Sequence, residues 1–328
     1  MKESAAVKVR LPATSANLGS AFDVAAVALD LHLEVSAQKA EQFTIHATGR
    51  NTAECSRPDG NLILATYAHV LQDARLPAPP LALRVHNEIP LGMGCGSSAA
   101  ARLAGLMLAR TLGGLSWSDE DLLAWATARE GHPDNVAACW RGGLSVSAVE
   151  RCGAPAASPA SIAMATVPVP AGWSAAILLP RHPVLTEVSR DVLPQHYERA
   201  AVVATLQRCG LLIAAFATGD GALLRCAMDD RMHQPYRRVL CPLLDHAEAL
   251  SRVPGVLGVA LSGAGPALLL VLDQTASRSA LEKYAGQLPD AADLEFLFCD
   301  FDRRGAQVDP TPEPILPGSS ERPVLPER

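Results

Sequence analysis

Three closely spaced glycines followed by two serines form the part of the sequence best suited to chemistry. The segment from Pro90 to Ala101 reads PLGMGCGSSAAA, with glycines at 92, 94 and 96 and serines at 97 and 98. Glycine lets the backbone turn tightly and approach a ligand closely, because it has no Cβ atom. The serines stand where a helix would begin, and a helix N-terminus presents free N–H groups and the positive end of the helix dipole. The segment therefore predicts a phosphate-binding loop.

This loop differs from two other phosphate-binding motifs. It has no Gly-Lys-Ser/Thr, which a Walker A loop requires, and its third glycine comes one residue too early for the G-x-G-x-x-G motif. An ordinary glycine-rich turn is the alternative that this segment alone leaves open.

Length and composition exclude several classes of protein. The chain has 328 residues, of which 49% are hydrophobic and 19% charged, so it can bury a large core in one or two domains. Its net charge of −6, without a basic block, argues against nucleic acid and anionic membranes as partners. No targeting signal and no run as long as a membrane span is expected, which predicts a cytoplasmic location.

The cysteines and histidines do not indicate a metal site. The eight cysteines contain no C-x-x-C pair and mostly fall in apolar segments, and the nine histidines have no clustered ligand spacing. Neither a zinc site nor a disulfide framework is expected.

Strands and helices alternate along the chain in an order that can position the loop. Alternating apolar residues predict strands at 7–11, 29–37, 43–47, 81–86, 144–149, 162–169, 175–179, 256–261, 267–272 and 294–299. Helical periodicity, with a capping box at Ser118–Asp121, predicts helices at 61–74, 99–112, 118–130, 186–193, 198–217 and 242–252. Loops are expected at 12–23 and 153–161, and the proline-rich residues 309–328 are expected to be a disordered tail. Two α/β domains meeting near residue 170 are the simplest interpretation.

Three motifs in this order resemble those of the GHMP small-molecule kinases. They are the glycine loop, the opening Pro12-Ala-Thr-Ser-Ala-Asn-Leu-Gly19, and the late Ser262-Gly-Ala-Gly-Pro266. Within that superfamily the chain is similar to the homoserine kinase family at Phe22-Asp23, His132-Pro-Asp-Asn135, Thr186-x-x-x-Arg190 and Gln234-Pro-Tyr-Arg237. The resemblance spans roughly residues 7 to 300.

The resemblance implies a two-domain α/β fold of the α+β type. Residues 1–170 would form a ribosomal-S5-like ATP-binding domain and residues 171–308 a ferredoxin-like domain, with the tail at 309–328. The chain departs from the family's usual residues at Ala21, Cys95, Gln234 and Ala267. None of these carries a group assigned to chemistry, but Ala21 and Ala267 line the expected cleft and leave room for a shifted substrate preference.

The resemblance also implies ATP-dependent phosphorylation of the L-homoserine side-chain hydroxyl, a step of threonine biosynthesis, with Mg²⁺ as cofactor. ATP would contact Pro90, Leu91, Gly92, Met93, Gly94, Cys95, Gly96, Ser97 and Ser98. Ser98 and Glu130 would hold Mg²⁺, which prefers oxygen ligands; a solvated charge at a helix end is the alternative for Glu130. The late glycine motif contributes Ser262, Gly263, Ala264 and Gly265.

Charge indicates how an amino acid would bind. Asp23 suits the ammonium, whereas Arg190 and Arg237 suit the carboxylate, since guanidinium groups bind carboxylates bidentately. Arg190 could instead be a surface residue, and only its spacing from Thr186, one helical turn earlier, favours a shared site. The resemblance adds Asn17 to this pocket, together with His132 and Asn135.

Asn135, His132 and Thr186 are the candidate catalytic residues. The resemblance places the amide of Asn135 at the acceptor hydroxyl, with Asp134 turned away. Positioning and electrostatics can carry phosphoryl transfer without a strong base. His132 as a general base is the alternative to His132 as an orienting group.

Two other functions remain open at this point. One is a GHMP kinase for another small alcohol, such as threonine, shikimate or mevalonate, although mevalonate has no ammonium to pair with Asp23. The other is a non-catalytic sensor, which would normally have lost Ser97, Ser98 or Glu130, all present here. The resemblance also implies a homodimer, which no stretch of the sequence indicates by itself.

Overall fold

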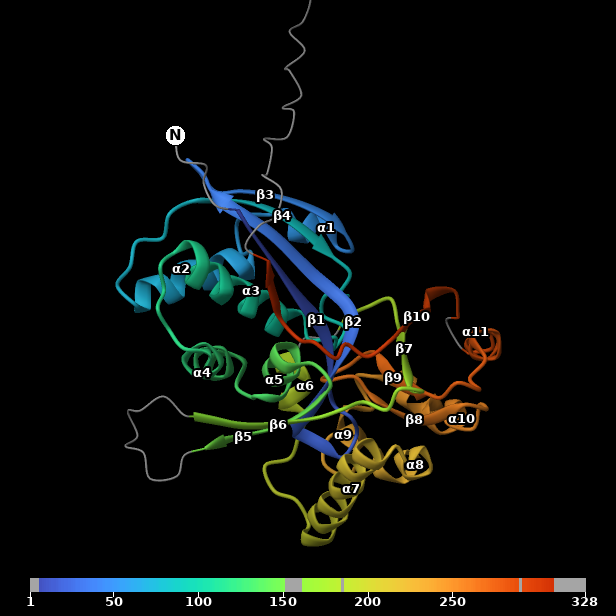
Figure 1. Cartoon of the computed structure of the whole chain (residues 1–328). Helices are drawn as coiled ribbons and strands as arrows, with labels where there is room; N and C mark the ends of the chain where they lie inside the picture. The colour runs from blue at the N-terminus through green and yellow to red at the C-terminus, as the bar shows by residue number, and fades with distance from the viewer. Residues whose placement is uncertain (1–5, 151–160, 184–185, 289–290, 310–328) are drawn as a thin grey trace, which may run out of the picture.

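A computed structural model describes residues 6–150, 161–183, 186–288 and 291–309, which form two β-sheets with helices (Figure 1). The expected loop at 153–161 lies almost entirely outside these residues, as do tail residues 310–328. The N-terminal sheet has the strand order β11-β1-β2-β4-β3, with β5 pairing with β2 and β6 with β5. Its strands are β1 (Val7–Asn17), β2 (Ala21–Lys39), β3 (Thr44–Gly49), β4 (Leu81–Asn87), β5 (Leu144–Glu150), β6 (Ser161–Val167) and β11 (Gln307–Asp309).

The segment 12–23, predicted to be a loop, is largely strand. β1 continues through Asn17 and turns directly into β2, with Ala16 paired to Ala26. The small residues that suggested a loop instead make room for a helix: Ala16 and Ala26 form a buried cluster with Ala138 of helix α5 (Asp134–Arg141). A short side chain lets the helix approach the sheet closely, and the same composition is typical of loops.

Four longer helices pack together around this sheet. They are α2 (Leu62–Asp73), α3 (Ser97–Leu112), α4 (Asp119–Glu130) and α5, preceded in the chain by the short α1 (Thr52–Cys55). The predicted capping box of α4 is present, and the helix ends at Gly131 in the left-handed conformation. α3 and α5 both pack against β1 and β2.

The C-terminal sheet contains β7 (Ser174–Leu179), β8 (Val256–Leu261), β9 (Leu268–Leu272) and β10 (Glu295–Cys299). Their order, β10-β7-β9-β8, with all pairs antiparallel, is that of a ferredoxin-like βαββαβ unit. The connections hold α6 (Thr186–Asp191), α7 (Arg199–Thr218), η1 (Gly221–Leu223), α8 (Leu224–Ala227), α9 (Gln234–Arg237), η2 (Pro242–His246), α10 (Ala247–Leu250), α11 (Arg278–Ala285) and η3 (Ala291–Asp293). The predicted two-domain α/β fold is confirmed.

The last described residues return to the N-terminal sheet. Phe301 bridges to Leu29, and β11 pairs with β1 through Val308 and Val9. The expected C-terminal domain at 171–308 therefore needs correction at its end, because residues 301–309 pair with strands of the first domain. Asp302 anchors this return: its buried carboxylate accepts a hydrogen bond from His32 Nε2 at 3.0 Å. Edge pairing of this kind leaves no periodicity that separates it from a loop.

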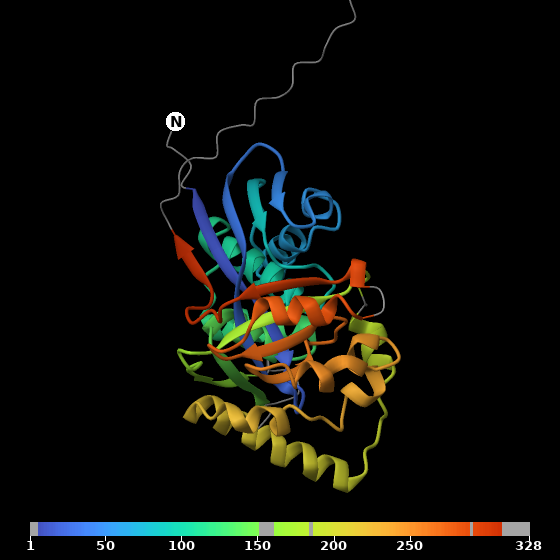
Figure 2. The same ribbon diagram turned by 90° about the vertical axis from the view of Figure 1, so that its right-hand side faces the viewer.

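Among the described residues, α7 is long and apolar enough to cross a membrane by length and composition alone, with a mean hydropathy of 1.7. The expectation that no run reaches the length of a membrane span is corrected at this helix. One such helix is a weak indication, since core helices of other proteins pass the same test. Here 22% of the apolar window is buried, and Figure 2 shows α7 along the lower edge, outside both sheets.

Candidate active site

The N-terminus of α3 opens onto a charged cavity of about 240 Å³ that both domains line. Its lining residues are Asn17, Asp23, Gly92, Gly94, Cys95, Gly96, Ser97, Ser98, Glu130, His132, Asp134, Asn135, Arg190, Arg237, Gly263 and Ala264. Most of the residues predicted from the sequence thus share one cavity, although they come from segments far apart in the chain.

The glycine loop is folded tightly against the protein. Gly96 is the N-cap of α3 with φ of 68°, and a Cβ there would lie 1.8 Å from Thr14 Oγ1. A Cβ on Gly94 would lie 2.0 Å from the Ser262 carbonyl oxygen. No side chain caps the start of α3, so its first N–H groups remain available to an anion.

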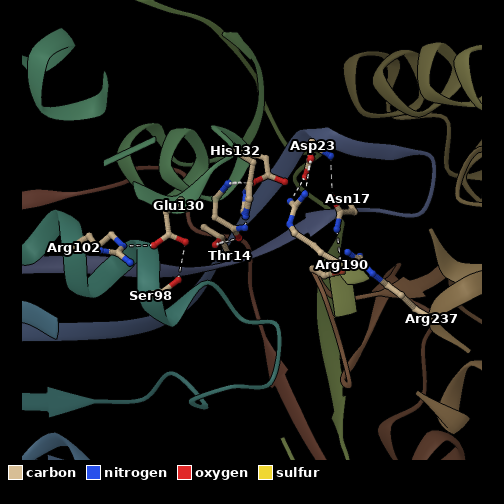
Figure 3. Close-up of polar contacts among 12 residues, drawn as sticks. Thr14, Asn17, Asp23, Ser98, Arg102, Glu130, His132, Arg190 and Arg237 are labelled. Atoms are coloured by element: carbon tan, nitrogen blue, oxygen red, sulfur yellow. Dashed lines mark hydrogen bonds and ion pairs between the residues drawn. The ribbon is translucent and has the colours of Figure 1, made fainter. Parts of the chain in front are cut away.

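Ser98 and Glu130 meet at the edge of this helix N-terminus. Ser98 Oγ donates to Glu130 Oε2 at 2.9 Å, and Arg102 Nε donates to the other carboxylate oxygen at 2.6 Å (Figure 3). A hydroxyl and a carboxylate oxygen this close together form a donor set that fits Mg²⁺. Arg102, which the sequence did not single out, holds the Glu130 carboxylate in place.

A hydrogen-bonded chain leads from His132 to Thr14. Asp134 Oδ1 accepts from His132 Nδ1 at 2.5 Å and from the Asn135 backbone N–H at 2.6 Å. Asn135 Oδ1 in turn accepts from the Thr14 hydroxyl at 2.7 Å. The other oxygen of Asp134 is buried with no partner among the described residues, although Asp134 was expected to turn away from the site.

His132 is held by the Asp134 carboxylate. Burial opposes its protonation, but the hydrogen bond to Asp134 and the charges of Asp134 and Asp23 outweigh burial and raise the pKa of His132. The Asp134 carboxylate fixes the ring and tautomer of His132 and makes the imidazole more basic. The orienting role and the general-base role of His132 both stay predictions.

Asp23 and Arg190 form a bidentate ion pair across the two domains. Arg190 Nη2 lies 2.6 Å from Asp23 Oδ1 and Nη1 lies 3.1 Å from Oδ2 (Figure 3). Burial opposes the charge of Arg190, but Asp23 outweighs it and raises the pKa of Arg190. The two residues assigned to opposite ends of an amino acid thus face each other directly.

Arg237 is buried beneath this pair. Its Nε donates to the Ser189 carbonyl at 3.0 Å and its Nη1 to the Gly263 carbonyl at 3.2 Å, whereas Nη2 has no partner among the described residues. Burial and the nearby Arg190 lower the pKa of Arg237. His233, whose pKa burial lowers to about 4, donates from Nε2 to the Gly19 carbonyl, so its Nδ1 accepts from Arg237 Nη1. A neutral histidine therefore orients the buried guanidinium.

The late glycine motif joins the two domains. Gly263 donates its N–H to the Ala16 carbonyl, and its own carbonyl accepts from Asn17 Nδ2. Asn17 Oδ1 accepts the backbone N–H of Asp23 at 3.0 Å and so holds the Asp23 backbone, which has φ of 56°. Ser262 lies outside the cavity, buried, with its hydroxyl donating to the Gly94 carbonyl.

A second cavity, apolar and of about 300 Å³, adjoins the first and shares Ser97 and Ser98 with it. Its other lining residues are Leu33, Glu54, Cys55, Gly60, Asn61, Leu62, Ile63, Val85, Asn87, Ile89, Leu91 and Ala101. This cavity has the size and character of a pocket for an aromatic base. The sequence pointed to Leu91, Ser97 and Ser98 but missed the rest of this cavity, because the other lining residues belong to no motif.

Some predicted residues lie elsewhere. Pro90, Leu91 and Met93 line a third cavity beside Arg50 and Arg181 rather than the charged cavity, although Leu91 also lines the apolar cavity. Gly265 packs against Cys241 rather than the cavity. Thr186 begins α6, but the structure does not describe its side chain, so its assigned role stays a prediction. Residues missed from the sequence include Thr14, Arg102 and His233.

Comparison with known proteins follows the same division into domains. The family described as "GHMP kinases N terminal domain" matches residues 61–143, and "GHMP kinases C terminal" matches residues 212–290. The homoserine kinase of Solibacter usitatus is 41% identical over 81% of this chain and 85% of its own length. That of Synechococcus is 36% identical over 81% of this chain and 85% of its own length.

Solved structures give the same result. The homoserine kinase of Cytophaga hutchinsonii superposes with a TM-score of 0.72 and 26% identity, covering 94% of this chain and 99% of its own. A putative homoserine kinase from Listeria monocytogenes has a TM-score of 0.70 and 28% identity, covering 92% of this chain and 99% of its own.

Proposed function

Because this chain belongs to the homoserine kinase family of the GHMP kinases, we propose that its site transfers the γ-phosphoryl group of ATP to the side-chain hydroxyl of L-homoserine. The chain is an ATP-dependent small-molecule kinase. The product would be O-phospho-L-homoserine, on the route to threonine.

The observation that carries this proposal is the pair of adjoining cavities. The apolar cavity suits the adenine base, the charged cavity suits a small zwitterion, and both meet at Ser97 and Ser98 on the uncapped N-terminus of α3. A triphosphate crossing that point would bring its terminal phosphate to the charged cavity. Holding the two substrates in line supplies much of the catalysis of phosphoryl transfer.

The charged cavity supports an amino acid as acceptor. Asp23 and Arg190 form an ion pair, and a zwitterion can replace both halves of that pair at once, with its ammonium on Asp23 and its carboxylate on Arg190. The free Nη2 of Arg237 supports carboxylate binding. A carboxylate oxygen of Asp134 lies within 4.8 Å of one of Asp23, which adds a second negative charge near the position proposed for the ammonium. An acceptor that draws Arg190 away but has no ammonium would leave Asp23 uncompensated.

Ser98 and Glu130 would hold Mg²⁺, which supplies positive charge against the β- and γ-phosphates when bound. Arg102 would keep the Glu130 carboxylate pointed at that position. Asn135 would position the acceptor hydroxyl, and His132, as a hydrogen-bond donor to Asp134, would orient the segment that carries Asn135.

The experiment that tests this function is ATP turnover by the purified protein with homoserine, threonine, shikimate and mevalonate in parallel. Homoserine should have the highest kcat/KM, with ADP formed one-for-one with O-phosphohomoserine identified by ³¹P NMR. Chelation of Mg²⁺ by excess EDTA should abolish turnover, and added Mg²⁺ should restore it. A higher kcat/KM for shikimate or mevalonate would overturn the assignment of the acceptor.

We also propose that the enzyme is a cytoplasmic homodimer that pairs through α7. The exposed side of α7 carries Val203, Leu206 and Leu211, with 46%, 67% and 38% of their surface exposed. Apolar patches of this kind are typical of interfaces. An antiparallel pair centred on Gly210, where a Cβ would meet nothing within 4 Å, would set Arg199 of one copy against Asp220 of the other. The net charge of −6 disfavours nucleic acid and anionic membranes as partners.

A further inference from the structure

We propose that Thr14 is a positioning residue of the phosphoryl transfer that acts through Asn135. Together with Asp134, it holds the Asn135 amide so that Asn135 serves the acceptor hydroxyl as a hydrogen-bond donor rather than as an acceptor. This inference rests on the proposed function and states which residue orients the group that contacts the acceptor hydroxyl.

The orientation of the Asn135 amide follows from its neighbours. Asn135 Nδ2 lies 3.2 Å from Asp134 Oδ1, which already accepts from His132 Nδ1 and from the Asn135 backbone N–H. A carboxylate oxygen surrounded by donors has no proton to give, so the side of the amide that faces it must be the NH₂ group. Asn135 Oδ1 then faces Thr14, whose hydroxyl donates to it at 2.7 Å.

This arrangement leaves an N–H group of the Asn135 amide for the substrate. The carbonyl of the amide is held by Thr14, and one Nδ2 hydrogen is held by Asp134, whereas the second has no partner among the described residues. Asn135 lines the charged cavity, so this N–H can reach a ligand there. A donor at the acceptor hydroxyl holds the oxygen in line without removing its proton.

Thr14 also ties this amide to the phosphate-binding loop. Its side chain is fully buried, its backbone N–H donates to the Cys95 carbonyl at 3.1 Å, and its hydroxyl lies directly against Gly96. A single residue on β1 therefore sets the distance between the loop that would hold the phosphates and the amide that would hold the acceptor. A displacement of about 1 Å between reacting groups can lower the rate roughly 100-fold.

The test compares Thr14→Val, which keeps the shape and removes the donor, with Thr14→Ser, which keeps the donor. We expect Thr14→Val to lower kcat about 10- to 100-fold, the range that misplacement costs, with KM for homoserine and Kd for ATP within a few-fold of wild type. Thr14→Ser should recover most of the lost kcat. Equal losses in both variants, or an unchanged kcat in Thr14→Val, would overturn the proposal.

Two further measurements separate positioning from folding. Thr66→Val is the matched control, because Thr66 is a buried threonine of α2 whose hydroxyl has no partner among the described residues, and it should leave kcat unchanged. In an Asn135→Ala background, Thr14→Val should lower kcat no further. A purely structural effect of Thr14→Val would instead add to the loss of kcat that Asn135→Ala causes. Wild-type turnover of homoserine, measured alongside, distinguishes failure of this proposal from failure of the proposed function.

Discussion

At the scale of single residues, the proposed acceptor pocket combines an ion pair with a third, buried guanidinium group. Asp23 and Arg190 pair with each other, while Arg237 is held by backbone carbonyls and a neutral His233. An amine or a carboxylate alone can satisfy only one of the two paired residues. If this pocket binds the acceptor as proposed, selectivity for amino acids would follow from the energy of leaving the other partner uncompensated.

This arrangement predicts that Asp23→Asn and Arg190→Leu discriminate between analogues. Both groups are partly exposed, so each loss should lie near the lower end of the range for charge pairs, about 2 kcal/mol or roughly 30-fold in kcat/KM for homoserine. Asp23→Asn should hardly affect 4-hydroxybutanoate, which lacks the ammonium, and Arg190→Leu should hardly affect 3-aminopropan-1-ol, which lacks the carboxylate. Steady-state kinetics of each variant with homoserine, 4-hydroxybutanoate and 3-aminopropan-1-ol measure these changes in kcat/KM.

Kd for ATP, measured by calorimetry, is the control and should change less than a few-fold in both variants. Equal losses for all three acceptors would mean that these residues support the fold of the site rather than the ends of the substrate.

At the scale of elements, the glycine loop depends on its protein neighbours as much as on a ligand. Gly94 and Gly96 lie against the Ser262 carbonyl and the Thr14 hydroxyl, so the absence of a Cβ allows the loop to pack on both domains. The same loop leaves the first turn of α3 uncapped. The same short segment therefore gives both a closely packed loop and a helix N-terminus whose N–H groups no side chain caps.

We therefore predict that Gly96→Val abolishes measurable ATP binding by pushing the loop away from Thr14. The cause is a Cβ that would lie 1.8 Å from Thr14 Oγ1, in addition to the strain of φ at 68°. Gly114→Ala is the matched control, because Gly114 has φ of 80° but nothing within 4 Å of a Cβ. It should cost about 1 kcal/mol of unfolding free energy and leave ATP binding intact. Fluorescence titration with nucleotide and thermal unfolding measure both; unchanged ATP affinity in Gly96→Val would contradict this account.

At the scale of the whole molecule, the site exists only where the two domains meet. Asn17 and Asp23 come from the first hairpin, whereas Arg190, Arg237 and Gly263 come from the second domain. The return of residues 301–309 to the first sheet further ties the domains together. The outer side of α7 carries the exposed apolar residues Val203, Leu206 and Leu211.

If α7 pairs two copies, charge reversal at its ends should control assembly. Leu206→Glu should convert a dimer to a monomer, because it buries a charge in an apolar contact. Arg199→Glu and Asp220→Arg should each weaken the dimer, and the double variant should restore it. Light scattering after size exclusion measures the mass, and co-sedimentation with anionic vesicles is the control for membrane binding. A wild-type monomer, or vesicle binding that Leu206→Glu abolishes, would contradict the proposed pairing.

The sequence by itself determined the features that depend on neighbouring residues. The capping box at Ser118, the start of α3 after the glycine loop and the alternation of β4 were all predictable, because backbone preferences and side-chain periodicity act over a few residues. The resemblance to a kinase family indicated which residues belong to the predicted site, among them Asp23, Arg190, Arg237 and Asn135.

Only the tertiary structure decided how those residues are connected. The Asp23–Arg190 ion pair joins positions 167 residues apart, and the Thr14–Asn135 hydrogen bond joins positions 121 apart. Residues 12–23 of the first hairpin looked like a loop because small residues suit both a turn and a strand beneath a close helix. Contacts of this kind depend on chain closure and packing over the whole molecule, and no local preference encodes which distant partner a buried side chain will meet.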